Sequence, residues 1–313
     1  VTKPQDPDKE REGMDSKINT DDTALDALDS WPRLLSNMSP DELRRLPTEE
    51  YSVSELLSAA ACPLRHHFEF ELRIDPQLDL YRGPWTSADL TADAEGAVAH
   101  ELLGGFPDLE GADLLARARQ LLLQALWRDG KRIHDHTEVD RAAEAITAHV
   151  RRFRATELAR RVTAARDVHR EAPFVYQMRP SIRIVGAIDV AFREPDGWRV
   201  LEFKTSDDRS RSVELSATPH GLQCALYASA IQAAVWPERV KEAFVFFTDS
   251  GRSHRWPLNL SLLASWEKRA ERIVDNLRRL RGRLNELQPF WTSQKCDGCP
   301  FIQLCDPIQP AAR

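Results

Sequence analysis

The chain has 313 residues, a length that suits one large domain with insertions or two domains. Hydrophobic residues make up 42% and charged residues 29% of it, which is typical of a globular protein and excludes disordered, collagen-like and membrane classes. No run of about 18 apolar residues is present, so neither a membrane-spanning helix nor a membrane partner is expected. The polar N-terminus lacks the apolar core of a secretory signal, which predicts a cytoplasmic location.

The net charge of −6 is unevenly distributed along the chain. Residues 1–50 contain seven basic and 13 acidic residues and therefore account for all of it. Two later segments, 151–170 and 251–288, each carry an excess of five positive charges. The acidity of the whole chain therefore does not exclude a polyanionic partner. We expect the acidic segment to compete weakly with such a partner for the basic helices.

The first half of the chain predicts a tail followed by helices. Residues 1–50 lack periodic apolar positions and predict an acidic, largely disordered N-terminal extension. The folded domain is expected to span 51–308, leaving 309–313 as a tail. Ser52, with Glu55 three residues later, predicts the start of a helix. Further helices are expected at 96–103, 111–128 and 138–162, of which the last two form a helical insertion at about 105–165.

The second half of the chain carries the strand signals. Glu194-Pro-Asp-Gly197 is a strong turn sequence and predicts a hairpin between the runs that flank it. The expected elements are strands at 173–178, 181–192 and 198–204, a helix at 218–235, a buried strand at 240–248 and an amphipathic helix at 260–287. This order predicts an α/β domain with a central sheet flanked by helices.

Two acidic residues and a lysine lie on the predicted hairpin. Because side chains alternate along a strand, Glu202 and Lys204 point the same way, and the hairpin can place Asp189 beside them. Such triplets also occur by chance on solvated strand faces. Here, however, the flanking residues are apolar, where unpaired charge is costly. Two carboxylates and an amine on one face therefore predict a Mg²⁺ site, with the lysine orienting or activating a water molecule.

Four of the five cysteines predict a second metal site. Cys296, Cys299 and Cys305 form a C-x₂-C-x₅-C run, and Cys62 can supply a fourth thiolate from the other end of the domain. From the residues alone, an iron–sulfur cluster, a tetrahedral Zn²⁺ ion and simple burial of the cysteines all remain open.

These motifs together resemble the PD-(D/E)XK nuclease superfamily, and specifically its RecB-like iron–sulfur branch. The similarity extends from about residue 52 to 305. It is carried, in the expected order, by Gly96-Ala-Val-Ala-His100-Glu-Leu-Leu103, Glu171-Ala-Pro-Phe174, Gly186-x-x-Asp189, Glu202-x-Lys204-Thr205 and Gln223-Cys-Ala-Leu-Tyr227. The resemblance implies a restriction-endonuclease-like core, a central mixed β-sheet flanked by helices.

The resemblance also implies roles for the motif residues. Asp189 and Glu202 would bind Mg²⁺ or Mn²⁺ together with the imidazole of His100 and the backbone carbonyl of Phe203. Lys204 would position the hydrolytic water and stabilise charge on the phosphate. Gln223 and Tyr227 would contact the DNA backbone or support the site, and Glu171 and Thr205 would support the ligands without binding the metal themselves. Glu202 stands where many relatives have Asp, which the superfamily allows.

For the four cysteines, the resemblance implies a structural [4Fe–4S] cluster that joins the two ends of the domain, with Zn²⁺ as the less favoured occupant. The implied function is a metal-dependent DNA nuclease acting on single strands or free ends, in repair, recombination or foreign-DNA processing. Two alternatives are a non-catalytic DNA-binding scaffold and the nuclease module of a helicase–nuclease complex. The chain has no Gly-x₄-Gly-Lys-Ser/Thr loop, so a motor would come from a helicase subunit or a region outside this sequence.

Overall fold

The computed structural model of the protein describes residues 49–74, 92–105, 109–128, 136–205, 207–283, 296 and 299–305. The predictions for residues 1–48 and for the tail at 309–313 lie outside this part of the chain. The first strand begins at Glu49, two residues before the expected start of the folded domain.

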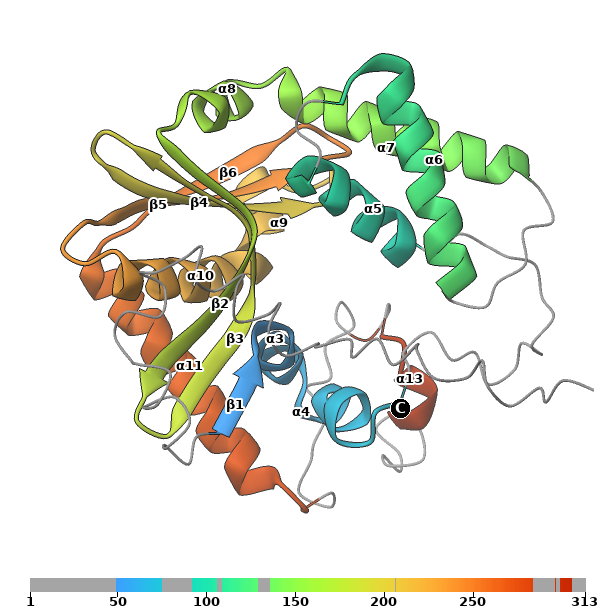
Figure 1. Cartoon of the computed structure of the whole chain (residues 1–313). Helices are drawn as coiled ribbons and strands as arrows, with labels where there is room; N and C mark the ends of the chain where they lie inside the picture. The colour runs from blue at the N-terminus through green and yellow to red at the C-terminus, as the bar shows by residue number, and fades with distance from the viewer. Residues whose placement is uncertain are drawn as a thin grey trace, which may run out of the picture.

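A mixed sheet of six strands forms the centre of the molecule (Figure 1). Its strands are β1 (Glu49–Ser52), β2 (Asp167–Arg179), β3 (Ile182–Glu194), β4 (Gly197–Lys204), β5 (Val240–Phe247) and β6 (Ser253–Pro257). β1 runs parallel to β3 and β4 runs parallel to β5, whereas the other neighbouring pairs are antiparallel. The prediction of a mixed central sheet is confirmed, as is the hairpin, in which Glu194 pairs with Gly197.

The long strand β3 exchanges one neighbour for another along its length. One of its edges pairs with β2 from Ile182 to Arg193. On the other edge, β1 pairs with residues 182–185 and β4 pairs with residues 190–194. The interval 186–189 therefore lies where the two ladders diverge, and it contains Asp189. A change of neighbour within a sheet opens room for polar groups at that point.

Helices cover both faces of the sheet. One face packs against α3 (Val53–Ala61), α10 (Gly221–Ala234) and α11 (Leu260–Leu280) in a single hydrophobic core (Figure 1). The other face packs against α5 (Ala92–Gly105), α6 (Gly111–Arg128), α7 (His136–Arg154) and α8 (Glu157–Ala164). Shorter helical segments are α4 (Pro63–His66), the π-turn η1 (His67–Glu71), α9 (Val213–Ala217), η2 (Thr218–His220) and α13 (Ile302–Cys305).

The helix starts follow local capping chemistry. The Ser52 side chain accepts a hydrogen bond from the Glu55 N–H at 3.0 Å, which confirms the predicted start of α3. The single helix predicted over 138–162 is wrong, because the chain breaks between α7 and α8. Thr156 caps α8 by accepting from the Ala159 N–H at 3.1 Å, and its hydroxyl donates to the Phe153 carbonyl at 2.7 Å. This side chain satisfies backbone groups that a continuous helix would have paired.

Other boundaries also differ from the predictions. β2 begins at Asp167 instead of 173, and β6 was not predicted at all. Both segments carry many polar side chains, so their strand periodicity is weak in the sequence. α11 ends at Leu280, because Arg281 leaves the helical conformation, and not at 287. Among the described residues, no helix combines the length and apolar character needed to span a membrane.

Candidate active site

Asp189 lies at the fork where β3 leaves the β4 ladder. The last pair of that ladder joins Val190 and Leu201. One step further, the Asp189 carboxylate accepts a hydrogen bond from the Phe203 N–H at 2.7 Å, in place of a backbone carbonyl. Asp189 is 7% exposed, so this contact satisfies a buried donor and holds the carboxylate in a fixed position.

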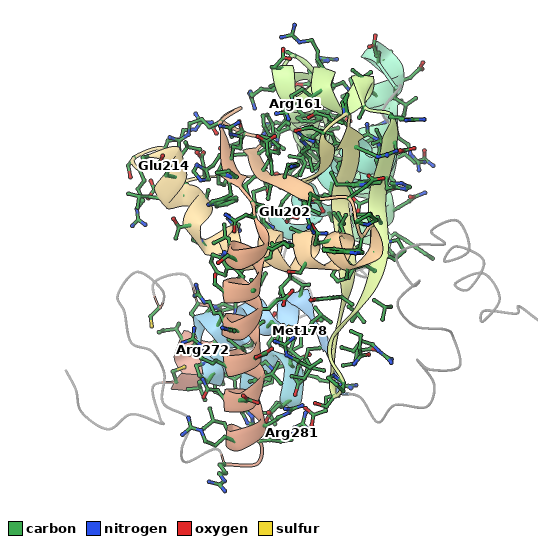
Figure 2. The ribbon with its side chains drawn as sticks, turned by 90° about the vertical axis from the view of Figure 1, so that its left-hand side faces the viewer. Arg161, Met178, Glu202, Glu214, Arg272 and Arg281 are labelled. Carbon is green, nitrogen blue, oxygen red and sulfur yellow. The ribbon has the colours of Figure 1, made fainter. Side chains whose placement is uncertain are left out.

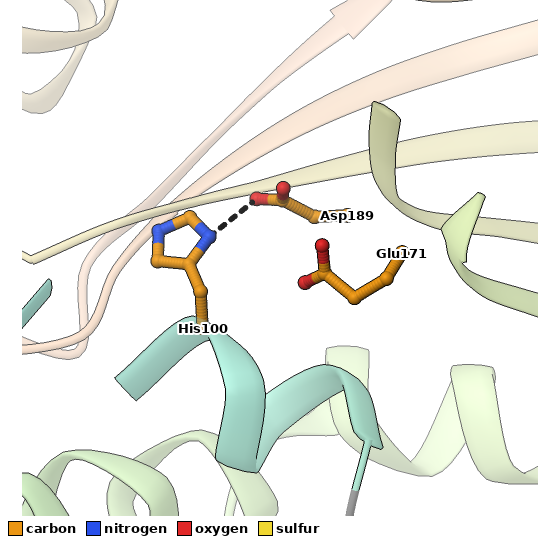
Figure 3. Close-up of side chains that lie close together, drawn as sticks. All are labelled: His100, Glu171 and Asp189. Carbon is orange, nitrogen blue, oxygen red and sulfur yellow. Dashed lines mark ion pairs between the residues drawn. The ribbon is translucent and has the colours of Figure 1, made fainter. Parts of the chain in front are cut away.

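Three potential metal ligands converge beside this fork (Figure 3). His100 of α5, Glu171 of β2 and Asp189 of β3 place ligand atoms within 4.8 Å of one another. The imidazole Nδ1 of His100 lies 3.3 Å from Asp189 Oδ2. One imidazole and two carboxylates are a donor set that suits Mg²⁺ or Mn²⁺.

Glu171 reaches this group through an unusual backbone conformation. It lies opposite Asp189 in the β2–β3 register, between the pairs Arg170–Val190 and Ala172–Ile188. Its φ of 45° is left-handed, which is uncommon for a residue with a side chain. Gly104 of α5 leaves the space that the Glu171 side chain occupies, since a Cβ there would lie 2.7 Å from Glu171 Cγ. Glu171 is therefore placed among the potential ligands themselves, closer to the metal position than the expected supporting role requires.

Glu202 and Lys204 form a second part of the site, on the side of the sheet that α10 covers. The Lys204 ammonium donates to Glu202 Oε1 at 2.5 Å, and the Gln223 amide donates to the same oxygen at 2.7 Å. Gln223 also donates to the Tyr227 hydroxyl oxygen at 3.0 Å. Gln223 and Tyr227 are one helical turn apart on α10, so the predicted pair acts as a support for Glu202.

The second oxygen of Glu202 has no comparable partner. Glu202 is 1% exposed, and its Oε2 is buried without a hydrogen-bond partner among the described residues. Glu202 does not belong to the three-residue group of potential ligands within 4.8 Å. A buried carboxylate oxygen without a donor is costly, and a cation beside it would remove that cost.

Titration of these groups reflects their burial and their mutual charges. Burial, followed by the nearby Asp189 carboxylate, raises the pKa of Glu202 and raises that of Glu171 to about 7. Burial alone would lower the pKa of His100, but its hydrogen bond to Asp189 and the surrounding carboxylates outweigh it and raise the pKa. Lys204 behaves likewise, because Glu202 outweighs its burial and raises its pKa. The site thus has an excess of negative charge that a divalent cation would neutralise.

The end of β4 is held by a residue that the sequence did not single out. The Thr248 N–H donates to the Lys204 carbonyl at 2.8 Å, and the next N–H, of Asp249, donates to the Thr205 carbonyl at 3.0 Å. The Thr248 hydroxyl lies 3.3 Å from His149 Nδ1 of α7. A polar residue directly after a buried strand was the available signal. Thr205 itself lies against Gly96 of α5, whose added Cβ would be 3.4 Å from the Thr205 hydroxyl.

The four predicted cluster cysteines lie in or beside a small separate core. Leu64 and Phe68, from the segment after Cys62, pack with Phe301 and Cys305, and both Cys62 and Cys299 contact this cluster. The Cys299 N–H donates to the Cys296 carbonyl at 3.0 Å. In the described part of the chain, the thiols do not form a group of three ligand atoms as close as that of His100. Cys224 is instead buried within α10.

A family model places this architecture. The model of the PD-(D/E)XK nuclease superfamily matches residues 50–306, so the chain belongs to that superfamily. This establishes a nuclease fold with the sheet and helix arrangement described above.

Curated relatives link the chain to helicase–nuclease proteins. It is 31% identical over 115 residues to an ATP-dependent helicase/nuclease subunit from Syntrophomonas wolfei, and the match covers 33% of this chain and 9% of that one. For the protein of the same name from Oceanobacillus iheyensis, identity is 30% over 115 residues, covering 31% and 9%. The chain thus matches about a tenth of the length of these relatives.

A solved structure shares the fold over most of the chain. A protein from Eubacterium rectale, named as a candidate exonuclease, superposes with a TM-score of 0.50 over 85% of this chain and 90% of its own. Identity between the two is 12%, so the similarity concerns the fold alone.

Proposed function

We propose that the protein is a Mg²⁺- or Mn²⁺-dependent deoxyribonuclease that hydrolyses phosphodiester bonds in single strands or at free ends. The observation that carries this proposal is the convergence of His100, Glu171 and Asp189 beside the buried Glu202–Lys204 pair. Three carboxylates facing one another are unfavourable in a buried site unless a cation is bound there. The acidic oxygens, including the unpartnered Glu202 Oε2, fit a hard divalent cation.

The residues of this chain would divide the work as follows. A bound divalent cation would supply Lewis-acid activation of the phosphate and of water. His100, Asp189 and Glu202 would hold it, with the Phe203 carbonyl as a further ligand, and Glu171 is a candidate additional ligand. Lys204 stays protonated because its pKa is raised, so it would stabilise charge that develops on the phosphate oxygens. Gln223 and Tyr227 would keep Glu202 in place.

The substrate and context are inferred from the relatives. Curated relatives are named as helicase/nuclease subunits, which supports a role in DNA repair or recombination, partnership with a helicase and action on unwound strands. Foreign-DNA processing is a second context for the same activity. The non-catalytic scaffold is disfavoured, because a chain without catalysis would not need to keep Asp189, Glu202 and Lys204 in a buried, charged cluster.

The test is cleavage of DNA by wild type, Asp189→Ala and Lys204→Ala in the presence of Mg²⁺ or Mn²⁺. Asp196→Ala is the matched control, since this exposed carboxylate lies in the turn of the same hairpin and pairs with Arg199. Wild type and the control should cleave, and the two site variants should lose activity by at least 100-fold. Linear and circular single strands, with labels at either end, separate end-directed from internal cleavage. An inactive wild type would favour the scaffold, and equal activity of all variants would overturn the assigned residues.

We further propose that Cys62, Cys296, Cys299 and Cys305 bind a structural [4Fe–4S] cluster. The supporting observation is the small core that joins the segment after Cys62 to the segment 299–305, more than 200 residues later. Anaerobically purified protein should show a broad absorption band near about 400 nm, as thiolate-ligated iron does. Cys62→Ala should lose iron and melt at a lower temperature. Stoichiometric zinc in a colourless protein would replace the cluster by the alternative occupant.

A further inference from the structure

The outward face of α11 carries cations that are not neutralised within the described fold. Lys268, Arg269, Arg272 and Arg279 are all exposed, and none of them has an acidic partner among the described residues. Their polar contacts within the helix are with groups that carry no charge: Arg272 with the Lys268 carbonyl and Arg279 with the Asn276 amide. In Figure 2, α11 runs down the face of the molecule that is turned to the viewer.

The acidic residues of the same helix are engaged elsewhere. Glu267 accepts a hydrogen bond from the Tyr176 hydroxyl at 2.6 Å, and Glu271 pairs with Arg179, so both bind β2. Asp275 lies 3.4 Å from Arg278. The charges of α11 are therefore segregated: its glutamates bind the sheet and its unpaired cations face outward.

The other basic segment of the sequence does not have this character. Arg161 binds Glu194 through two hydrogen bonds and also binds Glu242. Arg152 donates to the Thr248 carbonyl at 2.6 Å, and Arg160 pairs with Glu157. Much of the positive charge of residues 151–170 is thus used inside the fold, which leaves α11 as the stronger candidate for an anionic partner.

The acidic N-terminal segment joins the described fold beside α11. Glu49, the first residue of β1, pairs with Arg278 of α11 at 2.8 Å, and its N–H donates to the Ser181 carbonyl at 3.0 Å. Residues 6–29 contain nine acidic and three basic residues. The 19 residues between that stretch and Glu49 can span at most about 65 Å, whereas α11 is about 30 Å long. The acidic stretch can therefore reach every part of the helix.

We infer that residues 6–29 bind the outward basic face of α11 in the same chain. Opposite charge and attachment beside the helix both favour this partner over an external anion. Each exposed ion pair is weak, but several pairs formed at the millimolar effective concentration of a tethered segment act together. Since these pairs are exposed, salt should separate them: the screening length falls from about 10 Å at 0.1 M to about 3 Å at 1 M.

Zero-length carbodiimide cross-linking of the full chain tests this contact, because it joins a lysine to a carboxylate in direct contact. Mass spectrometry should find Lys268 linked to Asp or Glu of residues 6–29 at 20 mM salt. Lys241 is the internal control, because it is also exposed and lies at the start of β5. Links to Lys268 should exceed links to Lys241 by at least 10-fold and should fall by at least 10-fold at 1 M salt.

A variant and a mixing experiment complete the test. The triple variant Arg269→Gln, Arg272→Gln and Arg279→Gln keeps Lys268 and should reduce its links to residues 6–29 by at least 5-fold. Equal linking of Lys268 and Lys241, no response to salt, or unchanged linking in the triple variant would each overturn the inference. In a mixture of ¹⁴N and ¹⁵N chains, links that join the two kinds of chain at the random frequency would show contact between copies and would also overturn it. None of these readouts depends on catalysis.

Discussion

Gly104 of α5 provides a way to move one potential metal ligand without removing it. An added Cβ would lie 2.7 Å from Glu171 Cγ and 2.8 Å from Glu171 Oε1. An ordinary contact between carbon atoms is about 3.5–4.0 Å, so Gly104→Ala must displace the Glu171 side chain by about 1 Å. Metal–ligand distances tolerate only about 0.2 Å, and the carboxylate should therefore leave the site.

The expected result is weaker metal binding in a stable protein. Loss of one supporting group typically lowers metal affinity by about 10- to 100-fold, which is about 1.4–2.7 kcal/mol. Alanine is also favoured over glycine in a helix by about 0.5–1 kcal/mol, so the fold should not be lost. Titration calorimetry with Mn²⁺ measures the affinity, and thermal melting without metal measures the stability.

Gly96→Ala is the matched control, because it makes the same substitution in the same helix. Its Cβ would lie 3.4 Å from the Thr205 hydroxyl, an ordinary contact. Mn²⁺ affinity should therefore change little. The reasoning is refuted if Gly104→Ala and Gly96→Ala bind Mn²⁺ equally well. It is also refuted if Gly104→Ala still weakens binding in a Glu171→Ala background, since the two effects should not add when they act through one side chain.

Three further variants test the surroundings of the site. Burial and the nearby Lys204 lower the pKa of His220 to about 4, so stability should be full above pH 6.5 and fall by roughly 2–3 kcal/mol towards pH 4; chemical unfolding of His220→Gln should show a smaller loss over that range. Tyr227→Phe removes an acceptor of Gln223 and should cost about 1 kcal/mol in unfolding free energy, with Tyr51→Phe as a comparison at the sheet edge. Thr248→Val should lower stability by about 1–2 kcal/mol and reduce the turnover number, a result that an unchanged enzyme would contradict.

Much of the fold follows from local signals that were strong in the sequence. The turn from Glu194 to Gly197 fixed the hairpin, and the alternation of Glu202 and Lys204 placed both on one face of β4. These features depend on short-range geometry, which the chain encodes within a few residues. The break before α8 was also encoded locally, by Thr156 followed by an acid, but the apolar periodicity on either side concealed it.

The position of Glu171 could not be predicted in the same way. Its side chain meets His100 and Asp189 only because β2 pairs with β3 in one register and α5 packs across both strands with Gly104 against them. Those contacts join residues from three elements that are distant in sequence, and the left-handed φ of Glu171 has no local signature. Tertiary pairing thus determined the part of the site that the resemblance had left outside the set of metal ligands.

The distorted backbone at Glu171 also affects how the molecule meets other molecules. β2 is 13 residues long and pairs with β3 alone in the described sheet, so its outer edge could template a strand from another chain. The left-handed residue interrupts the regular row of donors and acceptors on that edge, and Pro173, two residues later, lacks an N–H altogether. The conformation that brings a carboxylate to the candidate active site therefore also protects the longest open edge of the sheet against aggregation.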